Sequence, residues 1–187
     1  MLITITGKAG SWKSTAAKSI TEKLGYQYIS IGDMRRTIAA QMGLNIIEFN
    51  KLGEKPENQR EFDLKYEDYQ RSLNPQDKIV LESRLWFRCQ PHSFKVFLTV
   101  DDKMAAQRIF SQKRETDSYN SWEDVYEETQ RRNQEDSERY QRLYGIVYQD
   151  PKNFDLIVDT TGQTIEQTVE QIVQSYISRQ QKKPVSE

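Results

Sequence analysis

The sequence has only one cysteine and one histidine among its 187 residues, and none of its apolar runs approaches the roughly 20 residues that cross a bilayer. A single cysteine excludes an internal disulfide and a zinc site built from several cysteines. We interpret Cys89 as a small core residue and His92 as an ordinary loop residue. The chain therefore resembles neither a disulfide-stapled domain nor a metalloprotein of the zinc type.

The sequence also lacks an excess of charge of either sign, since 27 Lys and Arg face 28 Asp and Glu and the net charge is −1. No overall field attracts nucleic acid or an anionic membrane, so any anion must be recognised by a local group of arginines. We expect no secretion signal before the first apolar segment. We therefore expect a cytoplasmic monomer whose partners are small molecules, with neither nucleic acid nor membrane among them.

Short apolar runs alternate with helical patterns along the chain, and this alternation predicts one α/β domain with a parallel sheet. The expected strands cover Leu2–Ile5, Tyr26–Ser30, Lys78–Glu82, Phe94–Val100 and Phe154–Val158. The expected helices cover Lys13–Leu24, Asp33–Met42, Asn45–Lys51, Pro56–Leu73, Asp101 or Asp102 to Arg114, Ser121–Leu143 and Thr164–Arg179, followed by a frayed tail over 180–187.

The segment between the first strand and the first helix is close to a phosphate-binding loop, Gly-x-x-x-x-Gly-Lys-Ser/Thr. Gly7, Lys13 and Ser14 fit the pattern, whereas Trp12 stands where it has its second glycine. The free N–H groups at a helix N-terminus bind phosphates, with Lys13 expected on the β- and γ-phosphates and Ser14 on magnesium. Trp12 stands at a position that often requires a positive φ, which side chains disfavour. The alternative is a chance match in a strand-to-helix turn that contains glycine.

Three further segments carry charged residues that suit phosphate chemistry. Asp33 and Arg36 follow the second strand, at the edge of a parallel sheet where ligands bind. Glu82 ends the third predicted strand and is placed to hold the water shell of magnesium. Arg132 and Arg139 are seven residues apart, so they share a helix face. Each segment also has an ordinary interpretation: a helix cap with solvated arginines, a surface ion pair, or a solvated helix face.

Together these segments make the chain resemble the cytidylate kinases of the archaeal type, within the nucleoside monophosphate kinases. The resemblance runs from Leu2 to about Ile177. It implies a three-layer P-loop kinase fold with a five-stranded parallel sheet in the order 2-3-1-4-5. It also implies an acceptor-binding region over 32–75 and a lid over 113–142. The motifs that carry it are the phosphate loop, Ile31–Arg36, Glu48–Lys51, Val80–Leu85, Lys95–Leu98, Gln107–Ile109, Arg139–Tyr140, Leu143–Ile146 and Phe154–Thr160.

The resemblance also implies roles for individual residues. Arg36 and Arg84 would grip the acceptor phosphate, Asp33 would help to organise that site, and Asp63 would face the acceptor base. Arg132 and Arg139 would act with Lys13 on the transferring phosphoryl group. The donor triphosphate would lie in the loop formed by Gly7, Lys8, Ala9, Gly10, Ser11, Trp12, Lys13, Ser14 and Thr15.

The implied activity is ATP- and magnesium-dependent phosphorylation of CMP or dCMP, with Ser14 and, through water, Glu82 on the metal. The attacking group is a phosphate oxygen that is already ionised near neutral pH, so the shortage of histidine is no obstacle. Trp12, Ser83, Gln59 and Val147 depart from the family pattern. Two alternatives stay open: a P-loop kinase for another nucleotide or small acceptor, and a weakly catalytic nucleotide-binding protein in which Trp12 impairs the loop.

Overall fold

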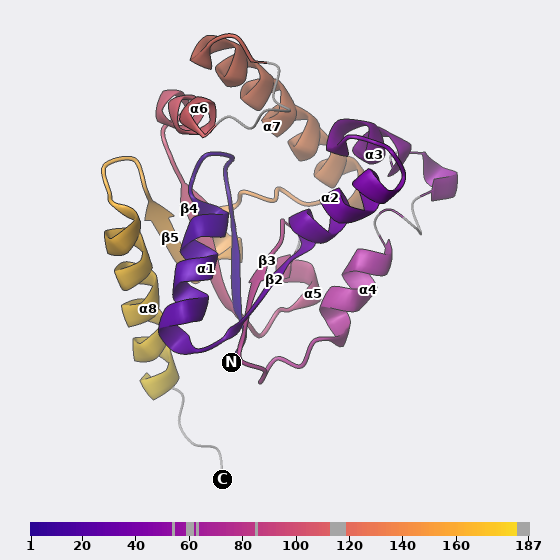
Figure 1. The fold of residues 1–187 in the computed structure, drawn as a ribbon. Coiled ribbons are helices and arrows are strands. Elements are labelled where there is room, and N and C mark those ends of the chain that lie inside the picture. The colour runs from indigo at the N-terminus through magenta and orange to yellow at the C-terminus, as the bar shows by residue number, and fades with distance from the viewer. Residues whose placement is uncertain (54, 59–61, 63, 85, 113–118, 183–187) are drawn as a thin grey trace.

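The central feature of the fold is a five-stranded parallel sheet in the order β2-β3-β1-β4-β5, as predicted (Figure 1). The computed structural model describes residues 1–53, 55–58, 62, 64–84, 86–112 and 119–182. In register, Ile3 of β1 lies beside Val80 of β3 on one side and Phe94 of β4 on the other. The strands are β1 (Ile3–Gly7), β2 (Gln27–Ser30), β3 (Ile79–Glu82), β4 (Phe94–Thr99) and β5 (Leu156–Asp159).

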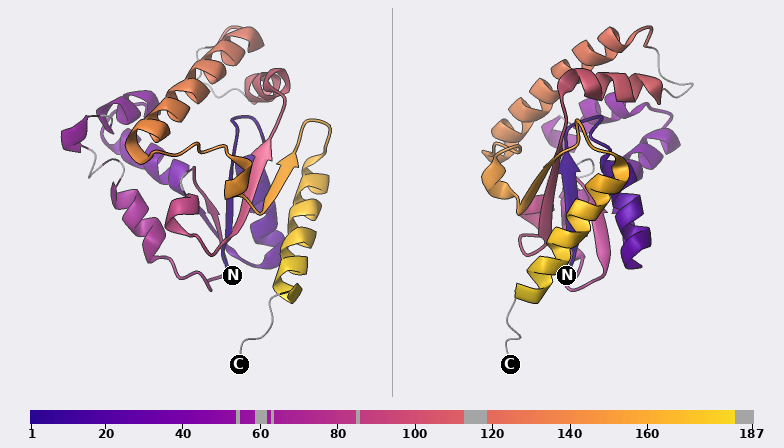
Figure 2. Two further views of the ribbon diagram at one scale, coloured as in Figure 1. Left: turned by 180° about the vertical axis from the view of Figure 1, so that it is seen from behind. Right: turned by 90° about the vertical axis from the view of Figure 1, so that its left-hand side faces the viewer.

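Helices cover both faces of the sheet, so the molecule has three layers (Figure 2). They are α1 (Lys13–Leu24), α2 (Ile31–Gln41), α3 (Ile46–Gly53), α4 (Lys65–Ser72), α5 (Trp86–Cys89), α6 (Asp102–Ser111), α7 (Trp122–Tyr144) and α8 (Ile165–Lys182), with 3₁₀ turns at Pro56–Asn58 and Pro151–Asn153. In the part of the chain that the structure describes, no helix is both long and apolar enough to cross a membrane.

Side chains of alternating strand residues build a separate apolar core on each face. One core joins Ile3 and Ile5 of β1 to Ala16 and Ile20 of α1, and to α8. The other joins Leu2, Leu81 and their neighbours to α2 and α4. All strands point the same way, so their carboxyl ends meet at one edge. The loop after β1 and the ends of β2 and β3 therefore lie close together at this edge.

Local capping explains why several predicted elements have their observed limits. The left-handed Gly25 ends α1 at its predicted residue, and Ser121 with Asp124 forms a capping box at the start of α7. Ser30, rather than Asp33, is the N-cap of α2, because its hydroxyl accepts the backbone N–H of Asp33 at 3.1 Å. The prediction that this helix begins at Asp33 was therefore wrong by two residues.

Other predicted limits also need correction. The first strand continues to Gly7 rather than ending at Ile5, since it pairs with β4 over its whole length. The segment predicted as one helix over Pro56–Leu73 is a 3₁₀ turn followed by α4, while residues 59–61 and 63 lie outside the described part. The last helix continues to Lys182 instead of fraying from 180, and Gln180 donates a hydrogen bond of 2.6 Å to the Tyr176 hydroxyl. The short helix α5 was not predicted.

Candidate active site

The loop between β1 and α1 has the backbone that a phosphate-binding loop requires. Gly7 and Gly10 have φ values of +149° and +72°. A Cβ on Gly7 would lie 2.1 Å from the carbonyl oxygen of Leu98, and a Cβ on Gly10 would lie 2.6 Å from that of Ala105. Both positions therefore exclude a side chain as well as favouring glycine. The loop is pressed against β4 and α6 and is held in one shape.

Trp12 adopts the left-handed conformation that the sequence pattern assigns to glycine, with φ 63° and ψ 24°. Its ring lies against the guanidinium of Arg108 on α6, at 3.5 Å from the ring centroid. Arg108 in turn donates hydrogen bonds to the Thr160 hydroxyl at 3.0 Å and to the Thr160 carbonyl at 2.7 Å. The cation–π contact offsets the strain of about 1–2 kcal/mol that a left-handed residue carries. The loop thus keeps its shape despite the missing glycine.

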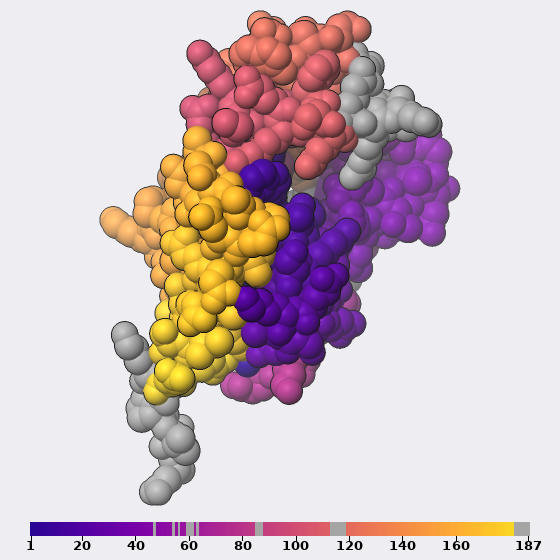
Figure 3. Space-filling model, turned by 60° about the vertical axis from the view of Figure 1, so that its left-hand side comes forward, coloured from indigo at the N-terminus to yellow at the C-terminus, as the bar shows by residue number. Residues whose placement is uncertain are grey.

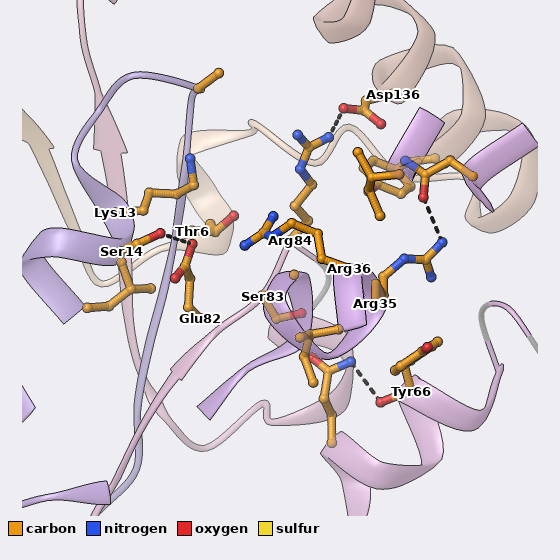
Figure 4. A pocket seen from close by; sticks show the side chains of 18 of the residues that line it. Thr6, Lys13, Ser14, Arg35, Arg36, Tyr66, Glu82, Ser83, Arg84 and Asp136 are labelled. Atoms are coloured by element: carbon orange, nitrogen blue, oxygen red, sulfur yellow. Dashed lines mark hydrogen bonds and ion pairs between the residues drawn. The ribbon is translucent and has the colours of Figure 1, made fainter. Parts of the chain in front are cut away.

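A pocket of about 310 Å³ opens at the carboxyl edge of the sheet (Figure 4). In the space-filling view, α6 and α7 overhang the N-terminal segment that carries the loop (Figure 3). The pocket brings residues from distant parts of the sequence together. The predicted site residues that line it are Ala9, Lys13, Ser14, Arg36, Glu82, Arg84, Arg132 and Arg139.

Lys13 is the cation at the start of α1 and faces the pocket. Its ammonium donates a hydrogen bond of 2.6 Å to the carbonyl oxygen of Lys8. Burial lowers the pKa of Lys13 from 10.5 to about 8, against the opposing effect of the Glu82 carboxylate. Three arginines, Arg84, Arg132 and Arg36, also lower it. An anion of high charge in this pocket would reverse these effects and keep Lys13 protonated.

This shifted pKa predicts how anion binding depends on pH. Lys13 is protonated below about pH 8 and loses its proton as the pH rises through that value. We expect the affinity of the ligand-free protein for a triphosphate to fall by up to about tenfold per pH unit above about pH 8. Isothermal titration calorimetry from about pH 7 to about pH 9.5 measures this affinity. In Lys13→Arg, whose guanidinium stays charged, we expect the affinity for the triphosphate not to fall over this pH range. An equal fall of affinity in that variant would contradict the attribution of the pH dependence to Lys13.

Ser14 and Glu82 form an oxygen-rich corner beside Lys13. The Ser14 hydroxyl donates to Oε1 of Glu82 at 3.0 Å, and the Tyr28 hydroxyl donates to its Oε2 at 2.5 Å. Hydroxyl and carboxylate oxygens suit magnesium, which is usually held by few protein ligands together with water and substrate phosphates. Among the described residues, no group of three or more His, Cys, Asp or Glu residues gathers as a metal site. The corner fits a magnesium ion that arrives with phosphates.

Four arginines from three different elements converge on the other side of Lys13. Arg36 of α2 forms an ion pair with Asp33, and Arg84, just after β3, forms one with Asp136 of α7. The positive charge of Arg84, followed by burial, lowers the pKa of Arg132 to about 10, so Arg132 remains charged near neutral pH. Arg139 completes the group. Cations packed this closely repel one another and are stabilised by an anion between them.

Several predicted residues lie near the pocket without lining it. Lys8 forms an ion pair with Asp102 at 2.8 Å, and the buried Ser11 donates to the Lys8 carbonyl. Thr15 is exposed, and Asp33 reaches the site only through Arg36. The remaining residue of the acceptor set, Asp63, lies outside the described residues.

The fold adds residues to the site that the sequence did not predict. Asp136 lies one helical turn after Arg132, so the i,i+4 spacing on α7 offered a signal for it. Tyr28 and Arg108 gave no such signal, because their contacts with Glu82 and Trp12 join residues far apart in the sequence.

Comparison with known proteins agrees with this geometry. The model of the cytidylate kinase-like family matches residues 2–162. A cytidylate kinase of Natronomonas pharaonis is 37% identical over 163 residues, which cover 86% of this chain and 81% of that protein. An S-adenosylmethionine-dependent nucleotide dehydratase of Lacinutrix mariniflava is 34% identical over 93% of this chain, but the match spans only 35% of that protein.

A solved structure supports the fold independently. The shikimate kinase from Bacteroides thetaiotaomicron superposes with a TM-score of 0.62 at 16% identity, over 95% of this chain and 98% of the other. At this identity the likeness extends to the fold alone. The sheet order and the position of the loop are those of a P-loop kinase.

Proposed function

Because this chain belongs to the cytidylate kinase-like family, we propose that it transfers the γ-phosphoryl group of ATP to CMP or dCMP with the help of magnesium. The observation that carries this proposal is the composition of a single pocket. The pocket holds Lys13 and Ser14 at the start of α1 together with a group of arginines contributed by α2, by the segment after β3 and by α7. Two polyanions that must react need such a set of cations between them.

In the proposed reaction, an oxygen of the acceptor phosphate attacks the γ-phosphorus of ATP while the bond from that phosphorus to the β–γ bridging oxygen breaks. The products are ADP and a nucleoside diphosphate. The phosphate loop and Lys13 bind the donor, and Arg36 and Arg84 bind the acceptor phosphate. Arg132 and Arg139 stabilise the charge on the transferring group. Magnesium would be held by Ser14 and, through water, by Glu82, and it would neutralise negative charge on the donor phosphates.

The ion pairs that Arg36 and Arg84 form indicate how the acceptor phosphate binds. Asp33 and Asp136 neutralise Arg36 and Arg84 in the ligand-free chain. A dianionic phosphate between these arginines takes over that role. In this proposal the region 32–75 binds the acceptor, and the region 113–142 closes as a lid that excludes water from the donor.

A coupled assay for ADP release tests the proposed function. With ATP and magnesium, we expect turnover with CMP and dCMP, and at least about tenfold lower kcat/KM with UMP, AMP and GMP. The panel also separates the other functions that the sequence leaves open. Preferred turnover of another acceptor would replace the proposed substrate, and ATP binding without turnover of any acceptor would refute the proposed activity.

A further inference from the structure

The pocket extends beyond its arginines to a wall formed by α4, and we propose that Glu67 and Gln70 on this wall select the acceptor base by accepting hydrogen bonds from its exocyclic amino group. The proposal rests on the proposed function and adds the residues that read the base. It assigns the preference for an amino-bearing pyrimidine over a keto pyrimidine to two side chains of α4.

Both side chains are deeply buried yet line the pocket. Glu67 is 4% exposed and Gln70 is 2% exposed. They are three residues apart on α4, so they lie on the same face of the helix. In Figure 4, Arg36 and Arg84 lie between Lys13 and Ser14 on one side and Arg35 and Tyr66, from α2 and α4, on the other. A nucleotide whose phosphate meets Arg36 and Arg84 thus has its base on the α4 side.

Each of the two side chains presents an oxygen that has no partner among the described residues. Oε2 of Glu67 accepts a hydrogen bond of 2.7 Å from Arg71, whereas its Oε1 accepts none. The amide nitrogen of Gln70 donates to the Tyr66 carbonyl at 2.9 Å, whereas its Oε1 accepts none. A buried acceptor without a donor is destabilising, so a ligand that supplies donors to these oxygens gains affinity.

The bond that each side chain already makes engages its other polar atom, so the unpaired oxygen is the atom left for a ligand. Arg71, whose side chain is 43% exposed, holds Oε2 of Glu67 toward the surface and leaves Oε1 for the interior. The bond to Tyr66 directs the Gln70 amide nitrogen to the helix and leaves its oxygen as the acceptor. These two side chains therefore leave two acceptor oxygens, Oε1 of Glu67 and Oε1 of Gln70, for a ligand in the pocket. The 4-amino group of cytosine has two N–H bonds, whereas the 4-keto oxygen of uracil has none.

Glu67→Gln tests this assignment because it barely changes the shape of the side chain. Arg71 favours the new amide oxygen, so the amide nitrogen turns to the pocket and presents donors to the base. We expect kcat/KM for CMP to fall about 100-fold and that for UMP to rise, so that the CMP preference is lost or reversed. Gln70→Met removes the second acceptor and should lower the same preference by about tenfold.

Asp68→Asn is the matched control, because Asp68 contacts the same Arg71 at 3.4 Å from an exposed position on α4. This variant should keep the wild-type CMP preference. The dissociation constants of CMP and UMP, measured by calorimetry, test base selection separately from turnover. If the wild type binds CMP over UMP and Glu67→Gln abolishes this, the inference stands even where no phosphoryl transfer occurs. If both variants keep the wild-type ratio, or the wild type does not distinguish the bases, the inference is wrong.

Discussion

Arg132→Ala is expected to lower kcat about 1,000-fold while the dissociation constant for ATP changes by no more than about threefold. Arg132 lies in the pocket beside Arg84, whose charge lowers the pKa of Arg132 to about 10. A guanidinium held among other cations is stabilised most when negative charge spreads over the transferring phosphoryl group. An interaction made chiefly in the transition state lowers kcat rather than binding, and an arginine in this role contributes 10³–10⁵ in other phosphoryl-transfer enzymes.

The neighbouring residue supplies the control for this variant. Arg131 precedes Arg132 on α7 but does not line the pocket of Lys13, and it pairs with Glu128 and Glu135 on the helix surface. Arg131→Ala removes the same charge from the same helix and should change kcat by less than about threefold. Equal turnover in Arg132→Ala and Arg131→Ala would show that Arg132 is not a catalytic arginine.

Arg84→Ala is expected to raise KM for CMP about 100-fold and to leave the KM for ATP nearly unchanged. Arg84 is placed to form charge-assisted hydrogen bonds with the acceptor phosphate, which are worth about 1.5–3 kcal/mol. The variant also leaves the Asp136 carboxylate in the pocket without its ion-pair partner, and its negative charge repels the incoming phosphate. Steady-state kinetics with each substrate varied in turn measure the two constants.

Arg88 offers the comparison for this second variant. It follows Arg84 by four residues in the sequence, is exposed, and lies over the ring of Tyr144 at 4.5 Å from the ring centroid. Arg88→Ala should raise KM for CMP by less than about threefold. A rise in KM for ATP that matches the rise for CMP in Arg84→Ala would contradict the division of the pocket into donor and acceptor sides.

The sequence predicted the parts of the fold that depend on local patterns. The alternation of apolar runs and helices gave the α/β class, and Gly25 ends α1 at its predicted residue. The sheet order came from the family resemblance, and the structure has the same order. The predicted cations, Lys13 with the arginines of three segments, meet in one pocket because parallel strands bring their loops to one edge.

Contacts between distant residues could not be predicted in this way. Ser30 competes with Asp33 for the first turn of α2, and only the backbone geometry decides between them. The oxygens of Glu67 and Gln70 matter because tertiary packing buries them, whereas in the sequence they are two polar residues of a charged helix. The Trp12–Arg108 contact joins residues 12 and 108 and has no local signal.

The contact between the Trp12 ring and Arg108 explains how the loop accommodates a residue other than glycine. The residue takes the left-handed backbone that glycine would take, so the turn from the loop into α1 is kept. Its ring also connects the loop to Arg108 and, through that arginine, to the segment after β5. The departure from the pattern is compensated by packing, and this agrees with an active rather than an impaired loop.

Transfer of label from [γ-³²P]ATP to CMP is the most direct test of the central claim that one pocket joins a donor site to an acceptor site. The purified chain, magnesium and both nucleotides are mixed, and the products are separated by chromatography. We predict that the label appears in CDP, with little released as inorganic phosphate. Label that remains in ATP, or that appears only as inorganic phosphate, would contradict the account.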